Sequence, residues 1–315
     1  MNEQAVSHRK ATKYPYFEEE TSAEVVNARM GKDADPRLRQ VMAAIVKHLH
    51  AAVKEIEPTH DEWLAAIKFL TDTGHMCTDW RQEFILLSDT LGVSMLVDTI
   101  NNRRPNGATE NTLLGPFYIP DAPIYESGAN ISLDGKGEPI VVRGTVADTD
   151  GKPVAGAKID VWQANDDGFY DVQQKGVQPD MNLRGLFTAD SEGKFWFRSA
   201  KPRYYPIPSD GPVGKLLDKM GRHPNRAAHL HMIVTAPGFE PVVTHIFTPD
   251  CPYLEEDAVF GVKESLIADF KHVDDPARAR EFGFANPFWS VHWDFVLAPA
   301  KAGAAERTMF HVSRS

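Results

Sequence analysis

Apolar residues in the first hundred positions of the chain recur at the spacing of an amphipathic helix. Between Leu38 and Ile56 they alternate steps of four and three residues, which predicts a helix with a narrow apolar stripe suited to packing on another helix. Thr59 and Glu62 have the spacing of a capping box, so a second helix is predicted from there toward Gly74. The stripe consists of Leu38, Met42, Ile45, Leu49, Ala52 and Ile56.

A third helix is predicted to begin near Thr78 and to include the sequence EFILLSDTLGVSMLVDTI, residues 83–100. This sequence is apolar on most sides, which predicts that the helix is well buried. Residues 101–112 follow as NNRRPNGATENT, and this turn-rich stretch is interpreted as a connector between two parts of the chain.

After the connector the apolar pattern changes from helical to alternating. The alternating stretches are residues 138–165, 185–200, 229–247 and 288–299. A glycine turn interrupts each of the first three stretches, at Gly151, Gly193 and Gly238, and this pattern predicts three strand pairs. Short strands between glycine and proline turns are typical of an antiparallel sandwich or barrel. We therefore predict an α+β protein, with a helical N-terminal domain over residues 1–105 and an antiparallel β-sandwich over residues 106–315.

Composition limits the classes of partner and the compartment. The 315-residue chain has a formal net charge of −10 at pH 7, and this acidic balance argues against nucleic acid or an anionic membrane as a partner. Cys77 and Cys251 belong to no motif, so free thiols in a reducing compartment are expected. The first twenty residues lack the apolar segment of a secretory signal, and no apolar run is long enough to span a membrane. We expect a cytoplasmic protein.

Two histidines occupy a stretch that otherwise looks like a buried strand, RAAHLHMIV, residues 226–234. On a strand His229 and His231 face the same side, about 6.5–7 Å apart, and two imidazoles placed this way can bind one metal ion. An isolated His-x-His pair more often holds a buried, hydrogen-bonded histidine, so the pair alone leaves that alternative open. The acidic stretch at residues 255–257 is interpreted as a solvated loop.

Two tyrosines stand in loops that could complete a metal site. Tyr170 ends a loop just after a predicted strand, and Tyr205 lies in a proline-rich loop. A tyrosine ionises at neutral pH only beside a strong positive charge, such as a trivalent metal ion. Phenolate oxygen favours a hard cation such as Fe(III), and imidazole also suits iron. The alternative for each tyrosine alone is a half-buried residue with a hydrogen-bonded hydroxyl.

The chain resembles the intradiol ring-cleaving dioxygenases over nearly its whole length. The resemblance rests on the helical N-terminal part and on the motifs LLGPFYIPDAP, VWQANDDGFYDVQ, RYYPIPSDGPVGKLL, GRHPNRAAHLHMIV and THIFTPDCPYLEEDAVFGVKESL. It implies a β-sandwich that carries one Fe(III) per subunit. Catechol-cleaving relatives have a glutamine where this chain has His245, and the chain is more similar there to the branch that cleaves hydroxyquinol.

The resemblance also implies roles for single residues. The iron ligands would be Tyr170, Tyr205, His229 and His231, with Tyr205 and His231 axial. Arg226 would steady the charge that develops on the bound ring, and a surface ion pair is its alternative. The pocket candidates are Leu86, Asp89, Gly115, Pro116, Phe117, Ile207, Pro208 and His245. Asp89 would accept the extra hydroxyl of a trihydroxybenzene or else be an exposed charge or helix cap, and His245 has a satisfied core histidine as its alternative.

The expected reaction is cleavage of 1,2,4-trihydroxybenzene (hydroxyquinol) by O2 between its adjacent hydroxyls. The product would be 3-hydroxy-cis,cis-muconate, equivalent to maleylacetate, and Tyr205 would leave the metal and act as a base. The stripe between Leu38 and Ile56 would form a homodimer, as in the family, where an apolar groove can hold a lipid. Two alternatives stay open: cleavage of catechol or chlorocatechol, and a non-catalytic β-sandwich binding module.

Overall fold

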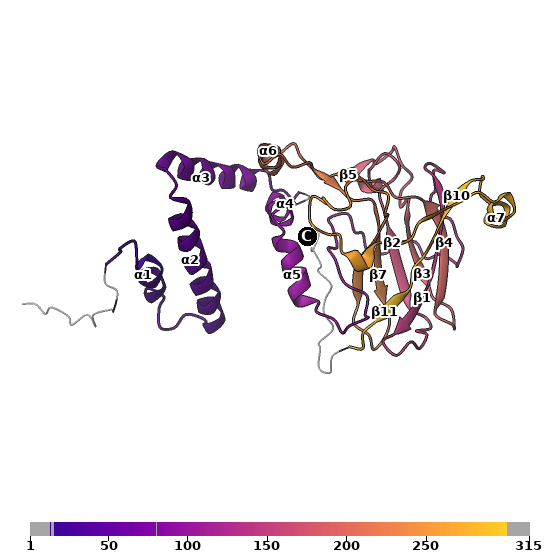
Figure 1. The fold of residues 1–315 in the computed structure, drawn as a ribbon, viewed down its shortest axis with the longest axis horizontal. Coiled ribbons are helices and arrows are strands. Elements are labelled where there is room, and N and C mark those ends of the chain that lie inside the picture. Colours follow the sequence, from indigo (N-terminus) through magenta and orange to yellow (C-terminus); the bar gives the residue numbers. More distant parts are fainter. Residues whose placement is uncertain (1–12, 14–15, 80, 301–315) are drawn as a thin grey trace, which may run out of the picture. The chain divides into compact units, whose positions relative to one another are not determined.

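The computed structural model describes residue 13, residues 16–79 and residues 81–300 (Figure 1). The chain divides into two compact units that meet in sequence between Thr71 and Asp72. The expectation that the chain begins without a secretory signal concerns a segment that lies largely outside the described residues. None of the helices in the described ranges combines the length and the apolar character needed to cross a bilayer.

The first unit is helical, as predicted. It contains α1 (Ser22–Ala28), α2 (Pro36–Ile56) and most of α3 (His60–His75). The carboxylate of Asp35 caps α2 by accepting a hydrogen bond from the N–H of Leu38 at 2.7 Å. The predicted capping box of α3 is present, because the N–H of Thr59 donates to the Glu62 carboxylate at 2.8 Å and the N–H of Glu62 donates to the Thr59 hydroxyl at 3.2 Å.

The apolar stripe of α2 is largely exposed among the residues that the structure describes. No residue of α2 is buried, and Leu49 and Ile56 are 59% and 69% exposed. Helix α1 does pack on α2, where the Ser22 hydroxyl lies 3.0 Å from Nδ1 of His50. An apolar face of this length on one helix is typical of a protein–protein interface.

The prediction of a single helix after Thr78 is wrong. Two helices form instead, α4 (Glu83–Thr90) and α5 (Val93–Asn101), and Gly92 between them has φ 72°. A left-handed residue cannot continue a right-handed helix, and glycine adopts this conformation at little cost. The predicted burial is also wrong, since only Glu83, Thr90 and Met95 are buried in these two helices. An apolar sequence indicates that the side chains of a helix tend to be buried, but it does not indicate that residues of the same chain bury them.

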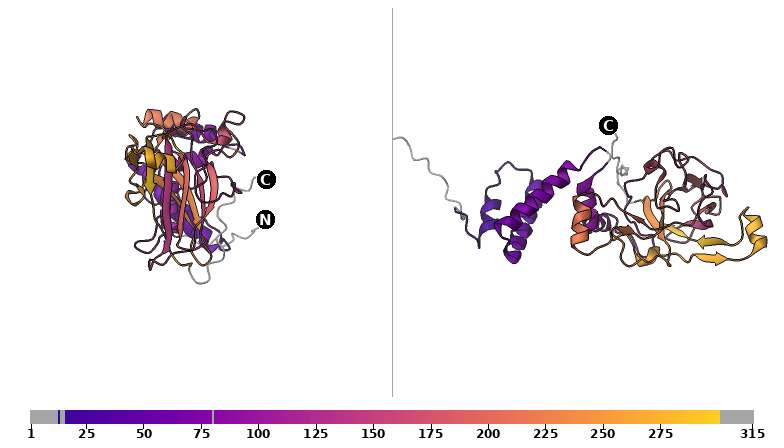
Figure 2. Two further views of the ribbon diagram at one scale, coloured as in Figure 1. Left: turned by 90° about the vertical axis from the view of Figure 1, so that its right-hand side faces the viewer. Right: turned by 90° about the horizontal axis from the view of Figure 1, so that it is seen from above.

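The second unit contains two β-sheets, which Figure 2 shows from two further directions. One sheet consists of β1 (Pro139–Asp148), β4 (Lys194–Ala200), β9 (Lys271–Val273), β10 (Phe288–His292) and β11 (Phe295–Leu297). The other has the order β3 (Arg184–Thr188), β2 (Lys158–Trp162), β7 (His229–Thr235), β8 (Val242–Phe247). The smaller elements are the ladder of β5 (Tyr205–Pro206) with β6 (Asn225–Arg226), helices α6 (Pro212–Lys219) and α7 (Pro276–Glu281), and 3-10 turns at Asp171–Gln173 and Glu264–Leu266.

Only one of the three predicted strand pairs is a hairpin. Strands β7 and β8 pair antiparallel across the turn at Gly238, as predicted. Strands β1 and β2 lie in different sheets, and so do β3 and β4, because β1 pairs with β4 and β2 pairs with β3. The predicted α+β class with antiparallel sheets is confirmed, and β1 adds two parallel contacts, with β10 and β11. A turn signal identifies a reversal of the chain, but it does not say whether the next strand stays in the same sheet.

The two faces of β7 have different environments. Leu230, Met232 and Val234 point into the core between the two sheets, together with residues of β1 and β4 such as Val142 and Phe197. His229 and His231 alternate with them and therefore face away from this core. The outer face of the four-stranded sheet carries a second, smaller cluster, whose members are Trp162, Ala164, Tyr170, Tyr205 and Ile233.

Candidate metal centre

Four potential metal-binding side chains meet on this outer face. The Tyr170 hydroxyl lies 2.8 Å from Nε2 of His231 and 3.0 Å from the Tyr205 hydroxyl, and the Nε2 atoms of His229 and His231 are 3.0 Å apart. None of the four residues is more than 5% exposed. The four residues named by the resemblance thus form one compact, buried cluster of two oxygen and two nitrogen donors.

Local structure brings the two tyrosines to the histidine strand. The side chain of Asn165 holds a tight loop after β2 by accepting hydrogen bonds from the N–H groups of Asp167 and Phe169, and this loop leads directly into Tyr170. Gly168 in the same loop has φ 82°, and a Cβ atom there would lie 3.0 Å from Cβ of Tyr205. Glycine therefore permits the close approach of the two tyrosine segments.

The two imidazoles are set up to act as neutral donors. Burial lowers the pKa of His229 to about 3, helped by the charge of Arg226, and burial together with His229 lowers the pKa of His231 well below its usual value. Nδ1 of His229 lies 2.5 Å from the carbonyl oxygen of Ala227. That carbonyl can only accept, so Nδ1 carries the proton and the lone pair of Nε2 faces the cluster.

The Tyr170 phenol needs a cation before it can ionise. Burial raises its pKa well above 10, and the adjacent Tyr205 adds to the shift. An ionised pair of tyrosines would be unstable in this apolar site without a strong positive charge between them. Two phenol oxygens and two neutral imidazoles fit a hard trivalent metal ion with affinity for both oxygen and nitrogen, and iron meets that requirement.

His245 is close to the cluster, but its ring orientation argues against a role as a ligand. Nitrogen atoms of His229, His231 and His245 lie within 4.8 Å of one another. The His245 ring stacks on that of His229 at 4.4 Å and 22°, so the nitrogen lone pairs of the two rings lie in separate, nearly parallel planes. His245 is fully buried, and burial lowers its pKa well below the usual value, although a backbone hydrogen bond with Leu113 opposes the shift. A buried ring with a backbone hydrogen bond fits the alternative of a satisfied core histidine as well as it fits a pocket wall.

Arg226 is in a buried ion pair and not in the surface pair that was its alternative. Its Nη1 lies 3.4 Å from Nε2 of His229, and its Nε lies 3.3 Å from Oδ1 of Asp257. Burial opposes the charge of Arg226, but Asp257 and the two tyrosines together raise its pKa. The interpretation of residues 255–257 as a solvated loop is wrong for Asp257, which is 5% exposed, whereas Glu255 and Glu256 are exposed.

Two of the predicted pocket residues in this part of the chain, Gly115 and Phe117, lie directly against the donor cluster. A Cβ atom on Gly115 would be 3.1 Å from Cε1 of His231, and Phe117 stacks on Tyr170 at 4.5 Å. Leu86 packs on the cluster that contains Ile207. Pro116 and Pro208 are exposed.

Asp89 is an acid in a partly desolvated position on α4. Burial raises its pKa, while a hydrogen bond with Ser94 and the charge of Arg226 lower it again in part. The electrostatic interaction with Arg226 relates Asp89 to the same site, so the alternative of a merely exposed charge does not describe it.

Two residues of the site were not predicted. Trp162 stacks on His231 at 4.6 Å and 10°, and Asp257 holds Arg226. Trp162 lies opposite His231 on the neighbouring strand, a register that only the paired sheet reveals. For Asp257 the sequence does contain a signal, because an apolar run, Ala258–Val259–Phe260, follows it directly and solvated acidic loops rarely continue in this way.

Asp160 lies two residues before Trp162 on β2, and its charge is expected to lower the free energy of unfolding at neutral pH. Burial raises its pKa from 3.8 to about 6, although hydrogen bonding with Tyr118 and the charge of Arg184 oppose the shift. A carboxyl group whose folded-state pKa is raised destabilises the fold above that pKa, and this penalty disappears as the pH falls below about 4. Asp160→Asn is expected to raise the free energy of unfolding by about 1 kcal/mol at pH 7.5, after allowance for a weaker bond to Tyr118.

Denaturant unfolding at pH 7.5 and pH 5 would measure this effect, and the gain should shrink at the lower pH. Asp150→Asn, at an exposed turn, is the matched control and should change stability by less than about 0.5 kcal/mol. A loss of stability in Asp160→Asn at pH 7.5 would contradict the argument.

Comparison with known proteins agrees with this geometry. A family model described as "Dioxygenase" matches residues 113–299, and a model described as "Catechol dioxygenase N terminus" matches residues 35–109. The chain is 66% identical to hydroxyquinol 1,2-dioxygenase of Rhizobium sp. (strain MTP-10005), over 90% of this chain and 96% of that protein. The crystal structure of hydroxyquinol 1,2-dioxygenase from Pseudomonas putida DLL-E4 superposes with a TM-score of 0.84 at 46% identity, covering 90% of this chain and 99% of that one. The structure of catechol 1,2-dioxygenase from Acinetobacter radioresistens gives a TM-score of 0.79 at 28% identity, covering 94% and 97%.

Proposed function

The chain belongs to the intradiol ring-cleaving dioxygenases, and on that premise we propose that it cleaves hydroxyquinol with O2 to 3-hydroxy-cis,cis-muconate, equivalent to maleylacetate. It is an oxidoreductase, and both atoms of dioxygen enter the product. The observation that carries the substrate assignment is the 66% identity over nine tenths of the chain to an enzyme named for this substrate. The same observation sets aside the non-catalytic binding module.

Tyr170, Tyr205, His229 and His231 are the proposed ligands of the iron, taken as one Fe(III) per subunit. The family uses non-haem iron, and the cluster of two phenols and two neutral imidazoles supports the ferric state. When bound, the ion would act as a Lewis acid that orients the diol and withdraws charge from its ring. Tyr205 is proposed to accept a substrate proton at its phenolate oxygen and so to act as a base.

The remaining residues would bind and orient the ring. Arg226, buried beside His229, would stabilise the negative charge that develops on the substrate. Asp89 would accept a hydrogen bond from the third hydroxyl, which catechol lacks. The pocket walls would be formed by Leu86, Gly115, Pro116, Phe117, Ile207, Pro208 and His245. An apolar wall that excludes water strengthens each of these polar contacts.

The direct test is oxygen uptake by the iron-loaded protein with hydroxyquinol and with catechol, measured side by side. A higher kcat/KM on hydroxyquinol, with a product absorbing as 3-hydroxy-cis,cis-muconate or maleylacetate, is the expected result. Faster turnover of catechol or of a chlorocatechol would support the rival assignment.

We further propose that residues 1–105 serve dimerisation and linkage and that residues 106–315 carry the reaction. The exposed apolar stripe of α2 supports a homodimer through the N-terminal helices. A lipid in an apolar groove at this surface stays a prediction, which mass spectrometry of the purified protein would test. The two unpaired thiols, Cys77 and Cys251, support a cytoplasmic location.

Charge on the α2 stripe should separate the subunits. Ile45 and Leu49 are 50% and 59% exposed in the single chain, and a dimer would bury both. The double variant Ile45→Asp/Leu49→Asp is expected to sediment as a monomer, because each buried, unpaired carboxylate would cost several kcal/mol. Lys47→Asp, at an exposed polar position on the same helix, is the control and should leave the dimer intact. A wild-type monomer, or a double variant that still dimerises, would refute the interface.

A further inference from the structure

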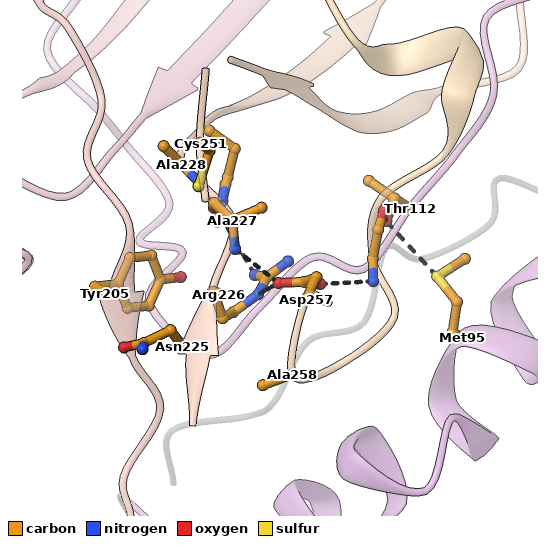
Figure 3. Close-up of polar contacts among 12 residues, drawn as sticks. Met95, Thr112, Tyr205, Asn225, Arg226, Ala227, Ala228, Cys251, Asp257 and Ala258 are labelled. Carbon is orange, nitrogen blue, oxygen red and sulfur yellow. Dashed lines mark hydrogen bonds and ion pairs between the residues drawn. The ribbon is translucent and has the colours of Figure 1, made fainter. Parts of the chain in front are cut away.

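We propose that Asp257 is a positioning residue of the metal centre, which holds Arg226 toward the substrate and fixes the backbone that orients His229. This inference rests on the proposed function. Asp257 lies in the motif THIFTPDCPYLEEDAVFGVKESL, 31 residues after Arg226, and the resemblance gives it no role in the site. Figure 3 shows it between Arg226 and the segment of Thr112.

Asp257 uses both carboxylate oxygens. Its Oδ1 accepts hydrogen bonds from Nε of Arg226 at 3.3 Å and from the N–H of Ala227 at 2.9 Å. Its Oδ2 accepts from the N–H of Gly261 at 2.7 Å. Two of these partners, Arg226 and Ala227, lie three and two positions before His229, so one buried carboxylate binds the segment that leads into the ligand strand.

The contact with Asp257 leaves Nη1 of Arg226 facing the donor cluster. Asp257 engages Nε, Nη1 lies 3.4 Å from Nε2 of His229, and Nη2 has no hydrogen-bond partner among the described residues. Arg226 is 3% exposed, and a buried donor without a partner is costly. Nη2 lies on the side of Gly261, whereas Nη1 faces the donor cluster, so the carboxylate both neutralises the guanidinium and holds Nη1 where a substrate oxygen could accept from it.

The second effect of Asp257 reaches the metal ligand through the backbone. Asp257 holds the N–H of Ala227, and the carbonyl of the same residue accepts the hydrogen bond from Nδ1 of His229 at 2.5 Å. Movement of this residue would weaken the bond that fixes the tautomer and the ring direction of His229. Partners of this kind commonly change metal affinity or activity about 10–100-fold when they are removed.

Hydrogen bonds to Thr112 hold the loop that carries Asp257 against strand β8. The Thr112 hydroxyl donates to the carbonyl of Gly261 at 2.8 Å, and the N–H of Thr112 donates to the carbonyl of Val243 on β8 at 2.9 Å. A Cβ atom on Gly261 would lie 2.7 Å from Nη2 of Arg226 and 3.1 Å from Oδ2 of Asp257. The position of Asp257 is therefore fixed by strand β8 on one side and by Arg226 on the other.

The test is a double-mutant cycle with Asp257→Asn and Arg226→Gln in the iron-loaded enzyme. Asp257→Asn keeps the shape of the side chain but removes its charge, and kcat/KM on hydroxyquinol is expected to fall about 30-fold. If Asp257 acts through Arg226, the double variant should be no more than about threefold worse than Arg226→Gln alone. Asp250→Asn is the matched control, because Asp250 also pairs with a cation, Lys201, but is 52% exposed, and it should stay within about twofold of wild type.

A spectroscopic measurement separates positioning from a general loss of structure. The tyrosinate-to-iron absorption band of Asp257→Asn should shift without substrate. The control Asp250→Asn should have the same iron content and the same melting temperature as wild type, which gives the reference values for Asp257→Asn. If Asp257→Asn does not fold, Thr112→Val removes only the hydroxyl that holds Gly261 and should cause the same band shift with a smaller loss of activity.

Additive losses in the cycle, or an unchanged band together with activity within about threefold of wild type, would overturn the proposal. Failure of the proposed function is distinguishable, because wild type would then consume no oxygen with hydroxyquinol. The band shift would still report on Asp257 in that case.

Discussion

Tyr205→Phe is expected to lower kcat on hydroxyquinol more than about 100-fold. Loss of a residue that only hydrogen-bonds a metal ligand typically costs about 10–100-fold, and loss of a ligand should cost more. The Tyr205 phenol is 5% exposed, and its oxygen lies 3.0 Å from that of Tyr170. Phenylalanine would fill the same space but offer neither an oxygen to the iron nor an acceptor for the substrate proton. Rapid kinetics and the visible spectrum of the iron-loaded protein would measure both consequences, and the tyrosinate-to-iron band should weaken or shift.

The neighbouring Tyr204 provides a control in the same peptide. Its side chain is 40% exposed and packs edge-on against Tyr253 at 4.8 Å, with no contact to the four-donor cluster among the described interactions. Tyr204→Phe should leave kcat within about twofold of wild type and the spectrum unchanged. Equal losses of kcat in Tyr204→Phe and Tyr205→Phe would contradict the assignment of Tyr205 as the second phenolate ligand.

His231→Ala is expected to abolish stable iron binding, and activity with it. Nε2 of His231 lies 2.8 Å from the Tyr170 hydroxyl and 3.0 Å from Nε2 of His229. The rings of Trp162 and His245 pack against the His231 ring. Its removal takes away one ligand and leaves a cavity beside the others. Iron per chain, measured by elemental analysis after loading and desalting, should fall close to zero.

Two further histidine variants make this result specific. His245→Gln should keep one iron per chain, because the stacked His245 ring is not turned toward the proposed ion. His272→Ala, at an exposed position on β9, should behave as wild type. Loss of iron in His245→Gln would instead point to a site built on the three histidines.

Local interactions explain which parts of the fold could be predicted from the sequence. The stripe of α2 and the capping box of α3 depend on residues three or four positions apart, and both helices form as predicted. The break at Gly92 was missed because the apolar pattern continues through it. The sheet assignments of β1 to β4 were missed because strand pairing links residues tens of positions apart and turn residues do not encode it.

The candidate site follows the same division. His229 and His231 share a face because of their spacing in one strand, whereas Tyr170 and Tyr205 entered through a resemblance that spans several motifs. Trp162 became visible only through the register of β2 with β7. The burial of Asp257 could have been predicted from the apolar run after it, but its contact with Arg226 could not. Their roles in catalysis stay predictions until the variants above are measured.

The placement of the donor cluster on the outer face of the four-stranded sheet has an evolutionary consequence. The residues that hold the two sheets together point the other way, so changes in the chain segments above the cluster leave the inter-sheet packing untouched. Substitutions in the loops that lead to Tyr170 and Tyr205 should therefore change the surroundings of the donors at little cost to the packing between the two sheets.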